Sequence, residues 1–144
     1  MKQLIITHTS VFIKTILVFF APIKPIILLV GLSTILDTIA GVWRAKKLKE
    51  KVSSRKARKG LIPKLMSYIV AVLLVYTTDF FIINELVSNF ISIDYLATKL
   101  IALALISVEV KSIDESFKAV KGCSFLQKIT DIVLKARDIR KNLR

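Results

Sequence analysis

The stretch RAKKLKEKVSSRKARK, residues 44–59, is the most basic part of the sequence. Long apolar runs flank it, from Pro25 to Trp43 before it and from Leu65 to Ile83 after it. A soluble protein would have to bury both runs beside its most repulsive surface. A basic segment between two apolar runs is instead typical of a cytoplasmic loop that joins two membrane helices. The basic residues of this stretch are Arg44, Lys46, Lys47, Lys49, Lys51, Arg55, Lys56, Arg58 and Lys59, and its one acidic residue is Glu50.

Composition supports the membrane interpretation. The chain has 144 residues, of which 54% are hydrophobic, and a formal net charge of +13. Its mean hydropathy is +0.64. Most basic residues lie either in 44–59 or after Glu109, and such segregation fixes the orientation of a membrane protein. The basic stretch lacks the interleaved aromatic residues of nucleic-acid binders, so we expect no nucleic-acid partner.

The few reactive side chains give no sign of catalysis. Cys123 is the only cysteine and His8 the only histidine, which excludes an intramolecular disulfide and a cysteine or histidine metal cluster. No carboxylate pair has a histidine, a metal-ligand partner or a phosphate loop beside it. The sequence therefore predicts neither an enzyme nor a cofactor.

The hydrophobic pattern predicts an all-α integral membrane protein with a single membrane domain, 1–144. We expect three transmembrane helices, at 25–43, 62–83 and 95–113. The basic segment 44–61 joins the first two on the cytoplasmic side, and 84–94, which has no basic residue, joins the last two outside. The third helix is expected to extend as far as Val120 and to end at Gly122. Residues 124–144 are predicted to form a basic amphipathic helix in the cytoplasm, on the anionic inner leaflet or against a neighbouring copy. Its first residues, S-F-L-Q at 124–127, have the S-x-x-Q form of a capping box.

The N-terminal segment, 1–21, has two possible placements. Gln3, Thr7, Ser10 and Lys14 share one helical face, so the segment either lies in the interface or spans the bilayer as a fourth helix. A lysine facing lipid at mid-depth costs about 2.5–3.5 kcal/mol, which favours the interface.

Four ionisable residues fall within the predicted spans, where charge is expensive and marks candidate functional positions. Asp79 and Lys99 lie at matching depth near the outer face, so we predict that they pair, within one chain or between chains. Glu109 lies near the inner end, within reach of Lys64 or of the basic segment. Asp37 lies deeper, beside small residues, and is expected to face the protein interior or another subunit.

Small residues in the spans predict close helix packing, which in lipid drives association. Gly31, Thr34 and Gly41 fall near one face of the first span, and Ala102 belongs to the small residues of the third. We therefore expect these helices to pack closely, and a homo-oligomer to form.

Several short motifs occur in a fixed order. The first apolar run carries D-x-x-x-G-x-x-x-A near its inner end, the basic segment contains serines and is followed by G-L-x-x-K, and the third run ends in E-x-x-S-I-x-E. Together they resemble the phage holins of the toxin-secretion and phage-lysis type. The F-A-P-I run of residues 20–23 is similar to versions in phages of Bacteroidales, including crAss-like phages. The motif residues are Asp37, Gly41, Ala45, Ser53, Ser54, Gly60, Leu61, Lys64, Glu109, Ser112, Ile113 and Glu115.

This resemblance implies a phage-encoded protein of the bacterial inner membrane that accumulates and then oligomerises into a pore or lesion. The lesion releases an endolysin, a functional partner that need not touch it. The alternative is a small membrane anchor or scaffold whose basic loop and tail recruit a cytoplasmic or phage structural protein. A transporter subunit is a weaker interpretation, because no span is broken at mid-membrane by glycine or proline.

Overall fold

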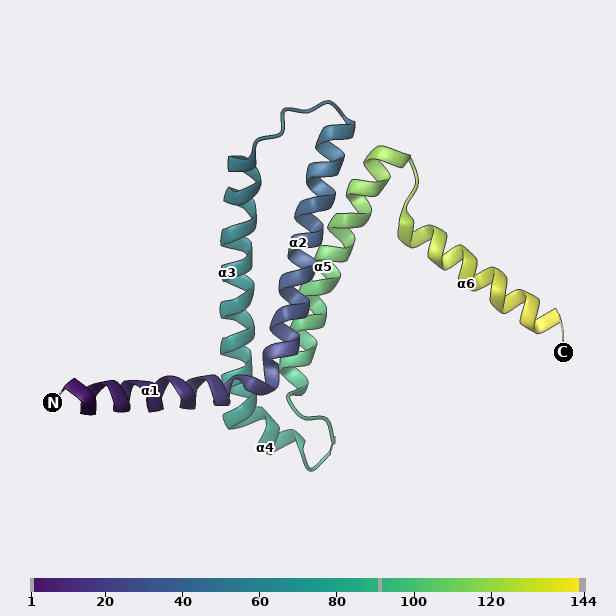
Figure 1. The fold of residues 1–144 in the computed structure, drawn as a ribbon. Coiled ribbons are helices and arrows are strands. Elements are labelled where there is room, and N and C mark those ends of the chain that lie inside the picture. The colour runs from purple at the N-terminus through teal and green to yellow at the C-terminus, as the bar shows by residue number, and fades with distance from the viewer. Residues whose placement is uncertain (1, 91, 143–144) are drawn as a thin grey trace.

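The computed structural model describes residues 2–90 and 92–142, and within them the surroundings of the side chains at 10–55, 57–90 and 92–135. Helices are the only regular elements in these ranges. Three long helices, α2, α3 and α5, stand side by side, whereas α1 and α6 extend away from opposite ends of this bundle (Figure 1). The bounds are α1 Lys2–Phe19, η1 Ala21–Ile23, α2 Lys24–Lys47, α3 Ser54–Thr78, η2 Asp79–Ile83, α4 Asn84–Val87, α5 Leu96–Lys121 and α6 Phe125–Asn142.

The ends of α2 and α5 follow from local chemistry. Pro25 lies in the first turn of α2, where its missing N–H costs no helical hydrogen bond. The last turn of α2 carries Arg44, Lys46 and Lys47, which suit the negative end of the helix dipole. Gly122 ends α5 in the left-handed conformation, with φ of 71°, as the sequence predicted.

The connection between α2 and α3 is shorter than the predicted loop 44–61. Helix α2 continues to Lys47 and α3 begins at Ser54, so only residues 48–53 are non-helical. Pro63 lies inside α3 rather than at its start. Residues 44–61 are rich in good helix formers, so α2 and α3 continue past the ends of the predicted spans.

The bundle has the polarity of a protein surrounded by lipid. Its buried polar side chains include Thr34, Asp79, Thr98 and Glu109, each with 0% exposure. Large apolar side chains instead face outward along all three long helices. Leu28, Leu74 and Leu103, one from each, have exposed fractions of 64%, 65% and 61%. In water these surfaces would drive aggregation, whereas in a bilayer they meet their preferred solvent.

Within the part of the chain that the structure describes, two segments are long and apolar enough to cross a membrane. Ala21–Lys47 has a mean hydropathy of 2.0 and Ala57–Val87 one of 1.9. They contain the predicted spans 25–43 and 62–83. Helix α5, which contains the predicted span 95–113, is not among them, because Lys99, Glu109 and Lys111 interrupt its apolar part.

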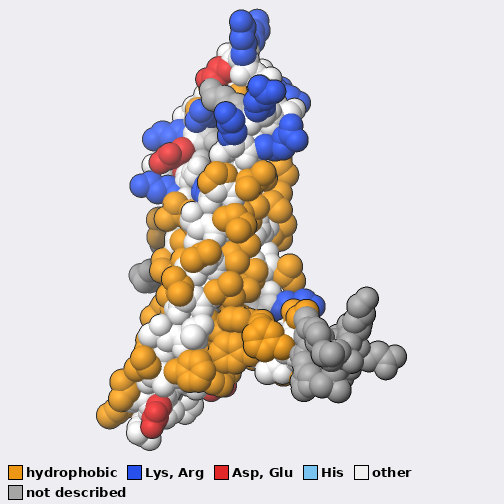
Figure 2. Space-filling view, turned by 90° about the vertical axis from the view of Figure 1, so that its left-hand side faces the viewer, with side chains coloured by type: hydrophobic (Ala, Val, Ile, Leu, Met, Phe, Trp, Pro, Cys, Tyr) orange, Lys and Arg blue, Asp and Glu red, His pale blue; other side chains and the backbone are white. Residues whose placement is uncertain are grey.

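Charge separates along the bundle as the sequence suggested. Lysine and arginine side chains gather at the end that carries the α2–α3 connection, and apolar side chains cover the length below it (Figure 2). Trp43 of α2 and Phe117 of α5 lie at this basic end, with their ring centroids 5.0 Å apart. An aromatic pair beside a basic cluster is typical of a membrane–water interface.

An aromatic cluster at the opposite end holds the corner between α1 and α2. The Tyr76 hydroxyl of α3 donates a hydrogen bond of 2.8 Å to the Phe19 carbonyl. The rings of Phe19 and Phe80 lie 5.0 Å apart. Helix α1 leaves this corner across the bundle axis rather than along it (Figure 1). This direction favours the interfacial placement of α1.

The junction between α5 and α6 depends on Asp114. Its Oδ2 accepts a hydrogen bond of 2.7 Å from the Ser124 hydroxyl, and its Oδ1 accepts one of 3.1 Å from the Leu126 amide. Ser124 Oγ in turn accepts a bond of 3.1 Å from the Gln127 amide, which is half of the predicted capping box. The hydrogen bond from Ser124 holds the pKa of Asp114 below its ordinary value.

We predict that this junction loosens in acid. A carboxyl whose pKa is lowered on folding adds stability above its unfolded pKa and loses it as the pH falls through the folded pKa. Protection factors of the Leu126 and Gln127 amides in micelles should hold at neutral pH and fall only once the pH drops below the ordinary pKa of an aspartate, about 3.9. In Asp114→Asn they should be low at every pH. Unchanged protection at low pH in the unsubstituted protein would contradict the prediction.

Candidate functional site

One lysine joins the three long helices through ion pairs. Lys64 Nζ of α3 lies 2.8 Å from Asp37 Oδ2 of α2 and 2.6 Å from Glu109 Oε2 of α5. Both contacts also satisfy hydrogen-bond geometry. The structure thus confirms that Glu109 reaches Lys64, and it places Asp37 in the interior of the bundle. The Lys64 cluster is defined here as Asp37, Lys64 and Glu109.

Burial makes the Lys64 cluster energetically important. The exposed fractions of the side chains are 0% for Glu109, 14% for Asp37 and 31% for Lys64. Removing one partner of a buried ion pair typically costs about 3–5 kcal/mol, because the other charge stays buried without compensation. One ammonium group here serves two carboxylates, so its loss would leave both uncompensated.

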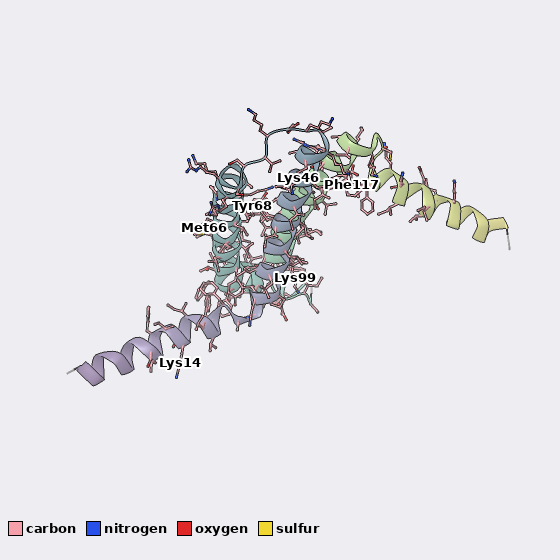
Figure 3. All side chains as sticks on the ribbon, turned by 45° about the horizontal axis from the view of Figure 1, so that its top comes forward. Lys14, Lys46, Met66, Tyr68, Lys99 and Phe117 are labelled. Carbon is pink, nitrogen blue, oxygen red and sulfur yellow. The ribbon has the colours of Figure 1, made fainter. Side chains whose placement is uncertain are left out.

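Neighbouring polar groups surround the Lys64 cluster. The Ser112 hydroxyl of α5 lies beside the Asp37 carboxylate, and so does Glu109. The Tyr68 hydroxyl lies beside Glu109. Figure 3 labels Tyr68, which belongs to α3. Among the described residues, Glu109 Oε1 has no hydrogen-bond donor. Two carboxylates and one amine leave the Lys64 cluster with an excess of acceptors.

Asp79 does not pair with Lys99 within the chain. Its Oδ2 accepts hydrogen bonds of 2.8 Å from both the amide and the hydroxyl of Thr98, near the start of α5. The Lys99 side chain is exposed and makes no ion pair with a described residue. The intrachain form of the predicted pair is therefore wrong. Lys99 follows Thr98 on the helix, and its side chain points to another side of α5 than Asp79. Two residues at the same depth in the membrane therefore need not be in contact.

The start of α5 explains why Asp79 is buried there. Tyr95, the residue before the helix, has a positive φ of 55° and gives no side-chain cap. Asp79 supplies the cap from another helix, and its negative charge suits the positive end of the α5 dipole. Asp79 opens η2, a π-helical turn. Such turns change the direction in which side chains leave a helix and often occur at functional positions.

Most of the predicted packing residues lie within the bundle. Thr34 and Ala102 are buried, and a Cβ on Gly31 would meet Leu65 of α3 at 3.8 Å. These residues bring α2, α3 and α5 together inside one chain. Gly41 is different, because a Cβ there would meet nothing within 4 Å.

Gly41 lines a cavity at the basic end of the bundle, between the end of α2 and the start of α3. We call this space, of about 350 Å³, the α2–α3 cavity. Residues of the sequence motifs surround it, since Asp37, Gly41, Ala45, Ser53, Gly60, Leu61 and Lys64 all contribute to its lining. The motif residues Glu109 and Ser112 lie beside its deep end, at the Lys64 cluster.

The remaining predicted residues lie apart from the Lys64 cluster. Arg44 and Lys51 line the α2–α3 cavity. Arg55, Arg58 and Lys59 border a separate depression beside Pro63. Lys46, Lys47 and Lys49 are exposed, as is Glu115 on α5. Figure 3 shows Lys46 and Lys99 towards opposite ends of the bundle. The side chain of Lys56 lies outside the described residues.

Sequence reasoning missed three contributors to these sites. Thr98 and Tyr68 carry no charge, and nothing in their spacing marked them as partners of Asp79 and Glu109. Arg44 is one of many cations in the basic segment 44–59, and nothing in that pattern indicates that its Nε is buried. For Thr98, the available signal was its place three residues after Tyr95, where a helix offers a free N–H.

Comparison with known proteins identifies a matching family model. The model of the bacteriophage holin family matches residues 14–138, which is most of the chain. No curated protein and no solved structure matches it significantly.

We predict that Lys64→Met destabilises the bundle by about 3–5 kcal/mol, because it leaves Asp37 and Glu109 as uncompensated buried charges. Lys99→Met is the matched control, since it removes an exposed lysine and should change stability by less than about 0.5 kcal/mol. The free energy of unfolding would be measured by denaturant titration in mixed micelles.

A triple variant separates lost charge from lost packing. Combining Lys64→Met with Asp37→Asn and Glu109→Gln removes every charge of the Lys64 cluster and should recover most of the lost stability. Equal losses for Lys64→Met and Lys99→Met would show that the ion pairs contribute little.

Proposed function

Because the chain belongs to the bacteriophage holin family, we propose that it is a holin that assembles in the bacterial cytoplasmic membrane and permeabilises it. The lesion would let an endolysin reach the cell wall. The observation that carries this proposal is the family match over residues 14–138. The outward-facing apolar surface of the bundle supports a membrane location.

The proposed topology has three spans, formed by α2, α3 and α5. The apolar part of α5 carries three charged residues, Lys99, Glu109 and Lys111. In the fold Glu109 is fully buried against Lys64, so it is not presented to lipid. Lys99 and Lys111 are exposed near the two ends of the predicted span, where long side chains can reach the headgroups.

The basic end of the bundle is proposed to face the cytoplasm, following the excess of lysine and arginine. Helix α6 leaves from this end, with apolar side chains such as Ile132 and Val133 exposed by 66% and 59%. It is proposed to lie on the anionic inner leaflet. Helix α1 leaves from the other end and is proposed to lie in the outer interface, which puts the N-terminus outside.

Assembly into an oligomer would use the outer faces of the bundle. The small residues of α2 and α5 are already occupied within the chain, because Thr34 and Ala102 are buried there. The faces left for neighbouring copies are apolar, and include Leu28, Leu32 and Ile35 on α2. In lipid, such faces associate through shape and packing rather than through water exclusion.

The second candidate function is a membrane anchor that does not permeabilise. The observation that favours it is α6, which extends away from the bundle with exposed side chains, as a recruiting segment would (Figure 1). The two functions differ in their effect on the membrane.

We predict that controlled expression in bacteria, together with an endolysin lacking its own export signal, produces sudden depolarisation followed by lysis. Expression without the endolysin should depolarise the cells and stop growth while turbidity falls little. A potential-sensitive dye and culture turbidity give the two readouts. Continued growth at high expression, with the potential intact, would support the anchor instead.

We predict further that the single native cysteine reports the topology. Cys123, between α5 and α6, should resist a membrane-impermeant maleimide in intact cells before depolarisation and react after the membrane is opened. In a Cys123→Ser background, Ser92→Cys should react in cells whose cytoplasmic membrane is intact. The opposite pattern would invert the proposed topology.

A further inference from the structure

The α2–α3 cavity lies where a lipid headgroup would be found under the proposed topology. It opens beside the connection 48–53 and reaches inward to Asp37 and Lys64. Asp37 lies seven residues before Arg44, so the lining extends about 10 Å along α2 at 1.5 Å per residue. A space at this depth meets the inner-leaflet headgroups and the start of the acyl chains.

The mouth of the α2–α3 cavity offers hydrogen-bond donors that lack acceptors. Arg44 lines it, and the buried Nε of Arg44 has no acceptor among the described residues. Lys51 adds a second cation from the connection. Ser53, also in the lining, is the residue before α3. Its side chain makes no capping hydrogen bond, so the first amides of α3 receive none from Ser53. Free donors beside two cations suit an anion with several acceptor oxygens.

The lining of the α2–α3 cavity has two acidic residues, Asp37 at the deep end and Glu50 at the mouth. Asp37 is paired with Lys64, which also pairs with Glu109, so the deep end keeps an excess of one carboxylate. Glu50 has no ion-pair partner among the described residues and would repel an anion at the mouth. Arg44 and Lys51 together carry two positive charges, which outnumber the one negative charge of Glu50. The mouth is therefore basic overall, while the deep end is held by the Lys64 cluster.

Two glycines line the α2–α3 cavity. Gly41 and Gly60 lie inside helices, where glycine is less favourable than alanine by about 1 kcal/mol. A Cβ at either position would meet nothing within 4 Å. Neither glycine is needed for close helix approach, and each leaves space at the wall of the cavity.

We propose that the α2–α3 cavity binds the phosphate of an anionic phospholipid headgroup, with Arg44, Lys51 and the start of α3 as its donors. The proposal rests on the proposed function for the inner-leaflet position of this end. Such a site differs from the general attraction of anionic lipids to a basic surface, because one headgroup occupies one defined place. A bound lipid would also fill the space between α2 and α3 beside the Lys64 cluster.

The test is native mass spectrometry of the full-length protein, delipidated in a neutral detergent and titrated with phosphatidylglycerol or phosphatidylcholine. We expect one saturable phosphatidylglycerol per chain and weaker binding of phosphatidylcholine. Arg44→Gln and Lys51→Gln should each weaken this site about tenfold, as loss of a charge-assisted hydrogen bond does. Glu50→Gln should strengthen it.

Matched variants separate a site from general charge. Arg55→Gln with Arg58→Gln removes two charges from the same basic segment outside the α2–α3 cavity and should leave the saturable site unchanged. Gly41→Leu should fill the cavity and abolish binding, whereas Gly41→Ala should retain it. Lys51 lies outside the helices, so its variant keeps the test valid if a helical variant fails to fold.

Three outcomes would overturn the proposal. Equal weakening by the Arg55–Arg58 pair and by Lys51→Gln would show binding by general charge only. Binding retained in folded Gly41→Leu would place the lipid elsewhere. Displacement of the lipid by an equal concentration of inorganic phosphate would show that the site binds the free ion. Lysis, measured in parallel, tests the proposed function separately. If the unsubstituted protein binds the lipid but does not lyse cells, the proposed holin function is wrong and the proposed lipid site still holds.

Discussion

The ammonium group of Lys64, shared by carboxylates of two other helices, is the contact on which the bundle depends. Its two bonds, of 2.8 Å to Asp37 and 2.6 Å to Glu109, connect α3 to both α2 and α5. In lipid no water is available to solvate a charge that loses its partner. The helices therefore cannot separate or rotate far at this level without exposing an ion to an apolar medium. A bundle with few buried apolar side chains gains a defined helix arrangement from this constraint.

The rest of the fold also has the distribution of side chains expected of a protein surrounded by lipid rather than water. Apolar side chains face outward, and polar side chains lie between the helices, where Thr34, Thr98 and Glu109 are fully buried. The two ends differ in what anchors them. The basic end has the Trp43–Phe117 pair and a surface of lysine and arginine. The opposite end has the aromatic cluster that fixes the corner of α1 through Tyr76 and Phe19.

Asp79 and the Lys64 cluster stabilise buried carboxylates in two different ways, although Asp79 Oδ1 and Glu109 Oε1 have no hydrogen-bond partner among the described residues. In the Lys64 cluster a side-chain cation compensates the charge, and the helices are joined by side chains alone. At Asp79 the compensation comes from the free backbone amide and the hydroxyl of Thr98 at the start of α5. The π-helical turn η2 begins at the same residue. The first arrangement links all three helices, whereas the second fixes where α5 begins.

The sequence by itself determined the helical membrane architecture, the segregation of charge, the end of α5 at Gly122 and the Ser124 cap, because these depend on composition and on neighbours a few residues away. It also marked Asp37 and Glu109 as buried charges, since an ion within an apolar run needs a partner. Depth alone suggested Lys99 for Asp79, and this was wrong within the chain, because depth does not fix which way a side chain points around its helix. Only the tertiary structure decided that one lysine serves two carboxylates, that Asp79 caps the start of α5 by accepting hydrogen bonds from Thr98, and that Gly41 borders a cavity instead of a helix contact. Each of these depends on the rotation of one helix against another, and that rotation is set by all the packed side chains together.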